Sequence, residues 1–252
     1  ATELNTAIKK SGYYEIEAVL EKEMADKNFT LTAGDGKTYT GFLREKDGRA
    51  IIPLGFLPSG KKLDISSKTP ATFSVIEKEV KTVKSSKLNL KIGQTVLHEI
   101  KQPGFYSLAN TVLTYKNNDN GMSDLRILVR NQSPLFRQKL QFGTTLSMDM
   151  EIGWLESGDV IELEIVSGGG DMDATLAYDI LFFPQVDIQG QIEQALSRRE
   201  PGTHIYPGRY FVNRNSPAAI NLKGLSDFTV YAYNVEMIIR RPSQRILEIQ
   251  GC

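Results

Sequence analysis

The stretch Trp154-Leu-Glu-Ser-Gly-Asp-Val-Ile-Glu-Leu-Glu-Ile-Val166 decides the fold class. Its middle, Ser157-Gly158-Asp159, has the composition of a tight turn, because glycine tolerates positive φ and aspartate accepts hydrogen bonds from nearby backbone N–H groups. After the turn, apolar and acidic residues alternate up to Val166, which is the two-residue period of a strand with one buried and one wet face. The stretch therefore predicts a turn followed by a half-buried strand of an antiparallel sheet.

The same pattern of short strands and turns extends over residues 88–186. Turn residues occur at Pro103-Gly104, Asn120-Gly121, Ser157-Gly158-Asp159 and Gly168-Gly169-Gly170. No helical pattern lies between these strands, so the segment is predicted to be a β-sandwich. An antiparallel jelly roll is the specific expectation.

Residues 1–84 are predicted to form a separate small α+β module that serves attachment. One helix is expected within residues 1–27, because apolar residues follow helical spacing among acidic ones. These apolar residues are Ile16, Val19, Leu20 and Met24. Short alternating runs then predict strands up to Lys78–Lys91, a lysine-rich segment expected to be a linker or an exposed edge strand. The expected boundary lies near Lys84.

Residues 187–252 are predicted to hold a connector helix and a small antiparallel β-sheet. Gly190–Arg199 is the only later segment with helical spacing, and Pro201-Gly202 is expected to end it. Short apolar runs separated by Asn- and Pro-containing turns follow, and they are typical of strands. No period of about 20 to 50 residues is visible, so a solenoid is not expected. The whole chain is predicted to be mainly β.

The charge balance argues against partners that bind by charge alone. Thirty Lys and Arg residues stand against thirty Asp and Glu residues, so the formal net charge is zero. Neither nucleic acid nor a membrane is therefore an expected partner. No window is long and apolar enough to span a membrane, and Ala1-Thr-Glu-Leu4 lacks the regions of a secretory signal peptide. Synthesis and folding in a cytosol are expected.

Side chains suited to catalysis or metal binding are scarce. Two histidines and one cysteine form neither an internal disulfide nor a Cys/His zinc site, and Cys252 is expected to be a reduced thiol. His98 alternates with apolar residues in an expected strand and His204 lies in a Pro-containing loop, so both are expected to be structural or solvated. The sequence predicts no enzymatic activity and no cofactor.

Two groups of acidic side chains could carry a site. Asp171 and Asp173 follow three glycines and could bind Ca²⁺, but two carboxylates fall short of its about six to eight oxygen ligands, and no metal is assigned. Glu162 and Glu164 are expected on the wet face of their strand. A hydrolase that uses loop carboxylates stays a second alternative function.

Three motifs occur in order within residues 97–184. They are Pro103-Gly-Phe-Tyr-Ser-Leu108, Leu155-Glu-Ser-Gly-Asp-Val-Ile-Glu-Leu163 and Ile180-Leu-Phe-Phe-Pro184. The segment resembles the globular-head jelly roll shared by complement-type heads and the tumour necrosis factor superfamily, although no second aromatic residue follows at Leu108. The resemblance covers roughly a third of the chain. It implies that three jelly rolls assemble around an axis into a homotrimer.

Aromatic residues of these motifs are candidates for the core or for a subunit interface. The expected last strand, Leu176–Phe183, is apolar on both faces, and both faces therefore need cover. One face meets the sandwich core, and the other meets a neighbouring subunit or a neighbouring module of the same chain. The interface candidates are Phe105, Tyr106, Tyr178 and Phe183, whereas Phe182 is expected in the core.

Residues 208–249 resemble the small β caps of phage tail-fibre and bacteriocin-knob proteins. The resemblance rests on Gly208-Arg-Tyr-Phe-Val212, the turn Asn213–Pro217 and an arginine in a late strand, either Arg240-Arg241 or Arg245. The glutamine usual in the penultimate strand of that family is missing.

Together these features predict a non-enzymatic structural or assembly protein. The two resemblances favour a phage virion component made in the host cytoplasm, such as a head decoration or a fibre-like protein, with itself and other virion proteins as partners. The alternative is a carbohydrate- or receptor-binding module that contacts a surface glycan. The side chains that would stack on a sugar are Tyr206, Tyr210, Tyr231 and Tyr233.

Overall fold

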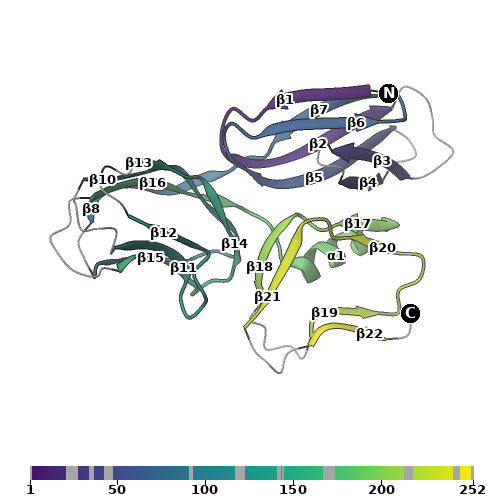
Figure 1. Ribbon diagram of the computed structural model, residues 1–252. Helices are drawn as coiled ribbons and strands as arrows, with labels where there is room; N and C mark the ends of the chain where they lie inside the picture. Colours follow the sequence, from purple (N-terminus) through teal and green to yellow (C-terminus); the bar gives the residue numbers. More distant parts are fainter. Residues whose placement is uncertain are drawn as a thin grey trace. The chain divides into compact units, whose positions relative to one another are not determined.

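Strands make up most of the described chain. The computed structural model describes residues 2–20, 28–33, 37–42, 48–90, 93–116, 123–140, 143, 145–166, 174–212, 218–240 and 245–250. Within these residues there is one α-helix, α1 (Ile188–Ser197), and all other regular elements are strands (Figure 1). The protein is therefore mainly β, as predicted.

The chain divides into two compact units. Unit 2 is the continuous segment Val80–Gln185, and unit 1 joins Ala1–Glu79 to Val186–Cys252. The borders of unit 2 lie close to those predicted for the jelly-roll segment. The segments predicted as a first and a third domain lie together in unit 1.

The lysine-rich segment forms the edge strand β8 (Lys81–Leu90), one of its two predicted alternatives. It pairs antiparallel with β16 (Ala174–Phe183), so that Lys81 lies opposite Phe182 and Lys87 opposite Ala177. This pairing places the strand in unit 2, which explains why the unit begins at Val80. Lysines along an edge oppose the addition of a further strand.

Unit 2 has the strand order of a jelly roll. One sheet contains β8, β16, β10 (Gly104–Tyr115) and β14 (Met150–Leu155) in that order, with β13 (Thr145–Ser147) also pairing with β10. The other contains β12 (Phe136–Lys139), β11 (Asp124–Val129), β15 (Val160–Val166) and β9 (Thr95–Glu99). All of these pairs are antiparallel. The chain crosses repeatedly from one sheet to the other, as jelly-roll connections do.

Strand β15 shows how the predicted alternation builds the sandwich. Ile161, Leu163 and Ile165 are almost fully buried, whereas Glu162 and Glu164 are partly exposed. In the turn before the strand, the carboxylate of Asp159 accepts a hydrogen bond from the backbone N–H of Glu156 at 2.8 Å. The predicted turn and half-buried strand are therefore confirmed.

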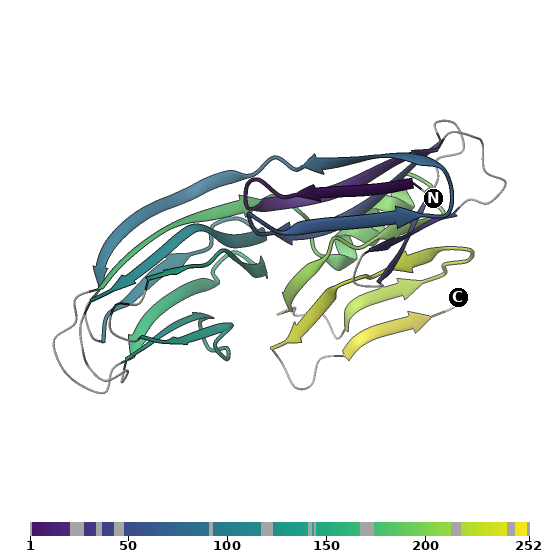
Figure 2. The same ribbon diagram turned by 45° about the horizontal axis from the view of Figure 1, so that its top comes forward.

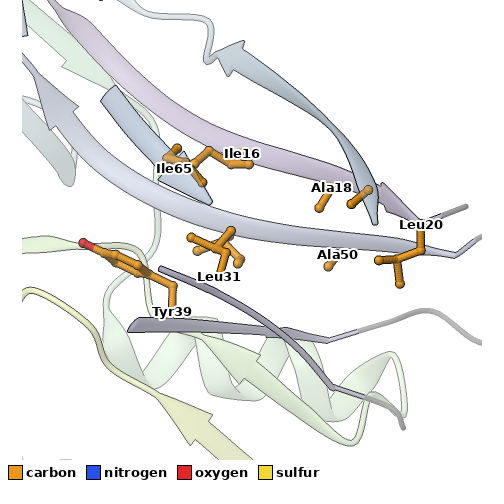
Figure 3. Close-up of a cluster of buried hydrophobic side chains, with 9 residues drawn as sticks. Ile16, Ala18, Leu20, Leu31, Tyr39, Ala50 and Ile65 are labelled. Carbon is orange, nitrogen blue, oxygen red and sulfur yellow. The ribbon is translucent and has the colours of Figure 1, made fainter. Parts of the chain in front are cut away.

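The N-terminal part of unit 1 is a second, smaller sandwich. One sheet has the order β1 (Thr2–Ala7), β6 (Lys62–Ser67), β3 (Asn28–Ala33) and β4 (Thr38–Phe42), and the other the order β5 (Arg49–Leu57), β2 (Gly12–Leu20) and β7 (Ala71–Glu77). Buried side chains from β2, β3, β4, β5, β6 and β7 form one cluster, shown in Figure 3. Ile16, Ala18, Ala50 and Ile52 at its centre have no exposed surface.

The helix predicted within residues 1–27 is wrong, because its described residues form β1 and β2. From Tyr14 to Leu20, burial alternates every second residue, and Ile16, Ala18 and Leu20 face the core. Together with Val19 these residues also fit a helical spacing, because the outer face of this strand carries an apolar residue too. Tertiary packing decides between the two periods here. Met24 lies outside the described residues.

The C-terminal part of unit 1 is a parallel coil of two turns, called the coil below. Its first turn contains β17 (Gly202–His204), β18 (Gly208–Val212) and β19 (Ala218–Lys223), and its second contains β20 (Thr229–Tyr231), β21 (Val235–Ile239) and β22 (Arg245–Gln250). Each strand of the first turn pairs in parallel with a strand of the second turn, at residues 27 positions further along the chain. The pairs begin with Gly202 and Thr229, Gly208 and Val235, and Ala218 and Arg245. Figure 2 shows β19 beside β22 and β18 beside β21.

The predicted antiparallel C-terminal sheet and the absence of a repeat are therefore wrong. A constant offset of 27 residues across three parallel ladders is the arrangement of a solenoid. Few identical residues mark the repeat, Tyr206 with Tyr233 among them. The predicted connector helix is confirmed as α1, and the side chain of Asp187 caps it by accepting from the N–H of Gly190 at 2.8 Å.

Candidate functional site

Four aromatic side chains of unit 1 form a continuous row, called the aromatic row below. The ring of His204 stacks on Tyr231 with centroids 4.8 Å apart, and Tyr231 stacks on Tyr233 at 6.0 Å. Tyr39 meets Tyr233 at 5.5 Å with the rings tilted by 59°. His204, Tyr231 and Tyr233 are partly exposed, so the row reaches the surface of the molecule.

The register of the coil creates this row. His204 and Tyr231 lie directly opposite each other in the parallel pair of β17 and β20. Parallel stacking brings side chains 27 residues apart into contact, although they are distant in the sequence. Tyr39 comes from β4 of the small sandwich, where Figure 3 shows it at the border of the core cluster, and its hydroxyl accepts a hydrogen bond from Asn234 at 3.1 Å.

Burial shifts the pKa values of two members of the aromatic row, His204 and Tyr231. It lowers the pKa of His204 from 6.5 to about 4, because the imidazolium loses its hydration. Burial, with a smaller contribution from Tyr233, raises the pKa of the Tyr231 hydroxyl above its ordinary value. Both shifts favour the neutral forms of these two rings, whose apolar faces and polar tips suit stacking on an uncharged ring or an apolar partner.

Acidification is expected to destabilise unit 1 through His204. Because the pKa of His204 is about 4 in the folded chain and 6.5 ordinarily, the unfolded chain binds more protons between these values. Neutral, buried His204 contributes fully to the free energy of unfolding above about pH 6.5. This contribution, on the order of 2 to 3 kcal/mol in total, is lost as the pH falls toward 4. Urea unfolding followed by hydrogen exchange at the amides of β20, at about pH 7 and about pH 4.5, measures it. His204→Asn should flatten this pH dependence; an unchanged slope would assign it to the carboxylates instead.

Two of the four predicted sugar-stacking tyrosines belong to the row, and two do not. Tyr231 and Tyr233 come together as described, whereas Tyr206 and Tyr210 are 5% and 1% exposed. The Tyr210 hydroxyl donates to the carbonyl of Tyr206 at 2.7 Å, and the Tyr206 hydroxyl donates to the carbonyl of Tyr14 at 3.2 Å. These two side chains hold the coil and cannot stack on a ligand from solvent. Sequence reasoning left out two members of the row: Tyr39, which β4 contributes, and His204, expected to be structural or solvated, which only the 27-residue register places beside Tyr231.

The predicted interface residues of unit 2 are buried within the single chain. Phe105, Tyr106, Tyr178 and Phe183 are all less than a tenth exposed within the single chain. Phe105 stacks on Phe183 with centroids 6.4 Å apart, as their pairing between β10 and β16 requires. Both faces of the last strand are therefore covered without a second copy, and Phe182 is buried as expected.

The remaining candidates do not gather into a catalytic group. Glu162 lies 2.5 Å from Arg130 and Glu164 3.6 Å from Arg126 across the strand pair. Burial, together with Lys84 and Lys101, lowers the pKa of His98. Asp171 and Asp173 lie outside the described residues.

The described residues offer neither a metal cluster nor a membrane-spanning helix. No set of three or more His, Cys, Asp or Glu side chains in the described ranges could hold a metal ion. Among those same residues, no helix has the length and hydropathy needed to cross a membrane.

Comparisons with known proteins give no family. No family model and no curated protein matches the chain. Among solved structures, the VP2 subviral particle of infectious bursal disease virus matches at 12% identity with a TM-score of 0.25, over 69% of this chain and 57% of that one. The present chain thus spans little more than half the length of VP2.

Two other solved structures match at similar levels. The A223 turret protein of Sulfolobus turreted icosahedral virus has 13% identity and a TM-score of 0.20, over 71% of this chain and 90% of its own. An isomalto-dextranase of Arthrobacter globiformis T6, complexed with panose, has 14% identity and a TM-score of 0.23, over 71% and 34%. TM-scores this low do not establish a common fold, and no function passes from these proteins to this chain.

Proposed function

We propose that the protein is a non-enzymatic structural component of a virus particle, of the head-decoration or fibre-like kind in a phage. The observation that supports the proposal is the jelly-roll strand order of unit 2, because jelly rolls recur in viral capsid proteins and in lectins. The sequence resemblances to a complement-type head and a tail-fibre cap point in the same direction. Since a fold alone does not fix a function, the proposal is tested on the particle itself.

The proposal requires the chain to be present in purified virus particles at a fixed ratio to the shell protein. Quantitative mass spectrometry of particles from the source organism measures this ratio. Chain that separates from the particles on a density gradient, or that occurs at a ratio varying between preparations, would overturn the proposal.

Unit 1, which contains the N-terminal segment, is proposed to attach to the particle, with unit 2 displayed. Lysine labelling of the full chain, bound and unbound, distinguishes the two arrangements. Lys81, Lys84 and Lys87 of the edge strand β8 should stay reactive on the particle, whereas lysines of unit 1 such as Lys62 become protected. The opposite protection pattern would reverse the assignment.

The proposal includes the lack of an intrinsic enzymatic activity. A screen of the full chain against glycans, esters and peptides is expected to find no turnover above background. Turnover that a single substitution removes, such as Asp171→Asn or Asp173→Asn, would favour the hydrolase alternative.

The aromatic row supports glycan binding as a second candidate function. Tyr231 and Tyr233 are inclined by only 16° to each other and are both partly exposed, so their rings offer apolar surface with polar edges to a sugar. If this is the function, Tyr231→Ala is expected to weaken binding to a glycan-array hit at least about ten-fold, while Tyr231→Phe keeps most of the affinity. Equal binding by the alanine variant would exclude the row as the site.

A further inference from the structure

The small sandwich of unit 1 has the same strand order as unit 2. In one sheet, β1-β6-β3-β4 corresponds to β9-β15-β11-β12, and in the other, β5-β2-β7 corresponds to β14-β10-β16. The corresponding strands also follow one another in the same order along the chain. Strands β8 and β13 are additional in unit 2, and the described part of the small sandwich has no strand in their places. The two sandwiches therefore share one topology.

The register of the paired strands agrees as well. β2 and β10 each begin with a glycine that lies opposite a leucine, and in each a bulge follows the tyrosine two residues after the glycine. The glycine and tyrosine are Gly12 and Tyr14 in β2, and Gly104 and Tyr106 in β10. Bulges occupy defined positions in related domains. A shared strand order with the bulge at the same place indicates more than a shared architecture.

Two contacts fix the start of β2. Ile8 exchanges backbone hydrogen bonds with the turn before β6, because its N–H donates to the carbonyl of Lys61 at 2.8 Å and its carbonyl accepts from the N–H of Gly60 at 2.7 Å. The hydroxyl of Tyr14 donates to the carbonyl of Lys10 at 2.6 Å. Together these bonds hold the entry of β2 against the turn before β6.

Unit 2 contains each of these contacts at the start of β10. The N–H of Ile100 donates to the carbonyl of Asp159 at 2.8 Å, and its carbonyl accepts from the N–H of Gly158 at 2.9 Å. The hydroxyl of Tyr106 donates to the carbonyl of Gln102 at 2.7 Å. The residues before and in β10 lie 92 positions after their counterparts, and the two turn residues lie 98 positions after theirs.

The sequences of these segments are also similar. Ile8-Lys-Lys-Ser-Gly-Tyr-Tyr14 and Ile100-Lys-Gln-Pro-Gly-Phe-Tyr106 share the isoleucine, the first lysine, the glycine and the last tyrosine. The turns Leu57-Pro-Ser-Gly60 and Leu155-Glu-Ser-Gly158 share the leucine, the serine and the glycine. The identical residues are those that make the two contacts or form the turn between the strands.

We infer that the small sandwich and unit 2 are tandem copies of one jelly-roll module. The inference goes beyond the proposed function and does not depend on it, because it concerns a repeat within the chain. If the chain is a particle component, the unit proposed to attach and the unit proposed to be displayed contain the same module.

One difference between the two turns makes the inference testable. In both turns a backbone N–H donates to the carbonyl three residues earlier, from Lys61 to Pro58 at 3.1 Å and from Asp159 to Glu156 at 3.2 Å. In unit 2 the carboxylate of Asp159 also accepts from the N–H of Glu156 at 2.8 Å. Pro58 has no N–H, and Lys61 has no acceptor in its side chain. Each turn thus has a matched pair of residues.

Transfer of this pair into unit 2 of the full chain is the first test. Asp159→Lys leaves the N–H of Glu156 without its side-chain acceptor, and it is expected to lower the urea midpoint reported by Trp154 fluorescence by about 1 M. The double variant E156P/D159K removes that N–H and should restore at least about half of the shift. The control E156A/D159K keeps the N–H and should restore little. A proline variant no more stable than this control would overturn the inference.

A substitution in the small sandwich is the second test. Ser11 corresponds to Pro103, so the backbone at Ser11 should accept a proline. Ser11→Ala and Ser11→Pro both remove the hydrogen bond that the N–H of Ser59 donates to the Ser11 hydroxyl at 2.8 Å. Hydrogen exchange at the amides of β2 should therefore differ by less than about three-fold between the two variants. Exchange about a hundred-fold faster in Ser11→Pro, as at a position that rejects proline, would show that the two copies are not equivalent.

Discussion

Replacing Gly104 by alanine is expected to lower the free energy of unfolding of unit 2 by about 3 to 5 kcal/mol. Gly104 begins β10 with a φ of +154°, a backbone conformation that costs other residues about 1 to 3 kcal/mol. An added Cβ would lie 2.6 Å from the ring of Phe182 and 2.8 Å from the carbonyl oxygen of Phe183. The backbone oxygen cannot move aside without disturbing the pairing of β10 with β16, and overpacking of this kind costs about 1 to 3 kcal/mol more.

The fluorescence of the single tryptophan reports this unfolding. Trp154 is 6% exposed in unit 2, and its indole N–H donates to the carbonyl of Gln185 at 2.8 Å. Gly158→Ala is the matched control, because Gly158 also has a positive φ, +91°, but nothing lies within 4 Å of the added Cβ. It should cost only about 1 to 2 kcal/mol. Equal losses for the two variants would show that crowding at Gly104 is not what requires glycine.

These two glycines illustrate why unit 2 could be predicted from the sequence. Both glycines belong to the motifs on which the jelly-roll resemblance rests. Each lies at or just before the start of a strand and has a positive φ, which favours glycine. Antiparallel strands with one solvent-exposed face can also be predicted from the alternation of apolar and polar residues, as in β15. Local rules were sufficient because the pattern repeats in nearly every strand of the unit.

Unit 1 was predicted less well, because its order is set by contacts distant in sequence. The apolar residues of β2 also fit a helical spacing, because Val19 on its outer face is apolar although its side chain is only half-buried. The coil depends on a 27-residue register that few identical residues mark. Short parallel strands look like hairpins when read singly, since the partner of each lies a full turn away.

The aromatic row has the same origin. Tyr231 and Tyr233 could be proposed from the sequence as a pair, since residues two apart share a face of a strand. His204 and Tyr39 could not, because the parallel pairing of β17 with β20 brings in the first and the packing of β4 brings in the second. The sequence does not distinguish Tyr206 and Tyr210 from ligand-binding tyrosines, because the fold alone supplies their hydroxyl partners, the carbonyls of Tyr14 and Tyr206.

The second large effect is expected from Gln191 on α1, whose side chain holds the first turn of the coil. The amide of Gln191 is buried, with 7% exposure. Its Oε1 accepts from the backbone N–H of Tyr206 at 2.7 Å, and its Nε2 donates to the Tyr210 hydroxyl at 2.9 Å and to the carbonyl of Val186 at 3.0 Å. Every hydrogen-bonding group of the side chain except one lone pair is thus used.

Gln191→Ala is expected to destabilise unit 1 by about 3 to 5 kcal/mol. The substitution leaves the buried N–H of Tyr206 without its acceptor, and each unsatisfied buried group costs about 1 to 3 kcal/mol. Hydrogen exchange at the amides of β18 measures the loss in the full chain.

Gln194→Ala is the control, since Gln194 lies on the exposed side of the same helix and its loss should change stability by less than about 0.5 kcal/mol. Because the fluorescence of Trp154 reports unit 2, it should not change in either variant unless the two units unfold together. Similar exchange rates in the two variants would mean that α1 stabilises the coil through its apolar face, through Ile188 and Ile192, rather than through its glutamines.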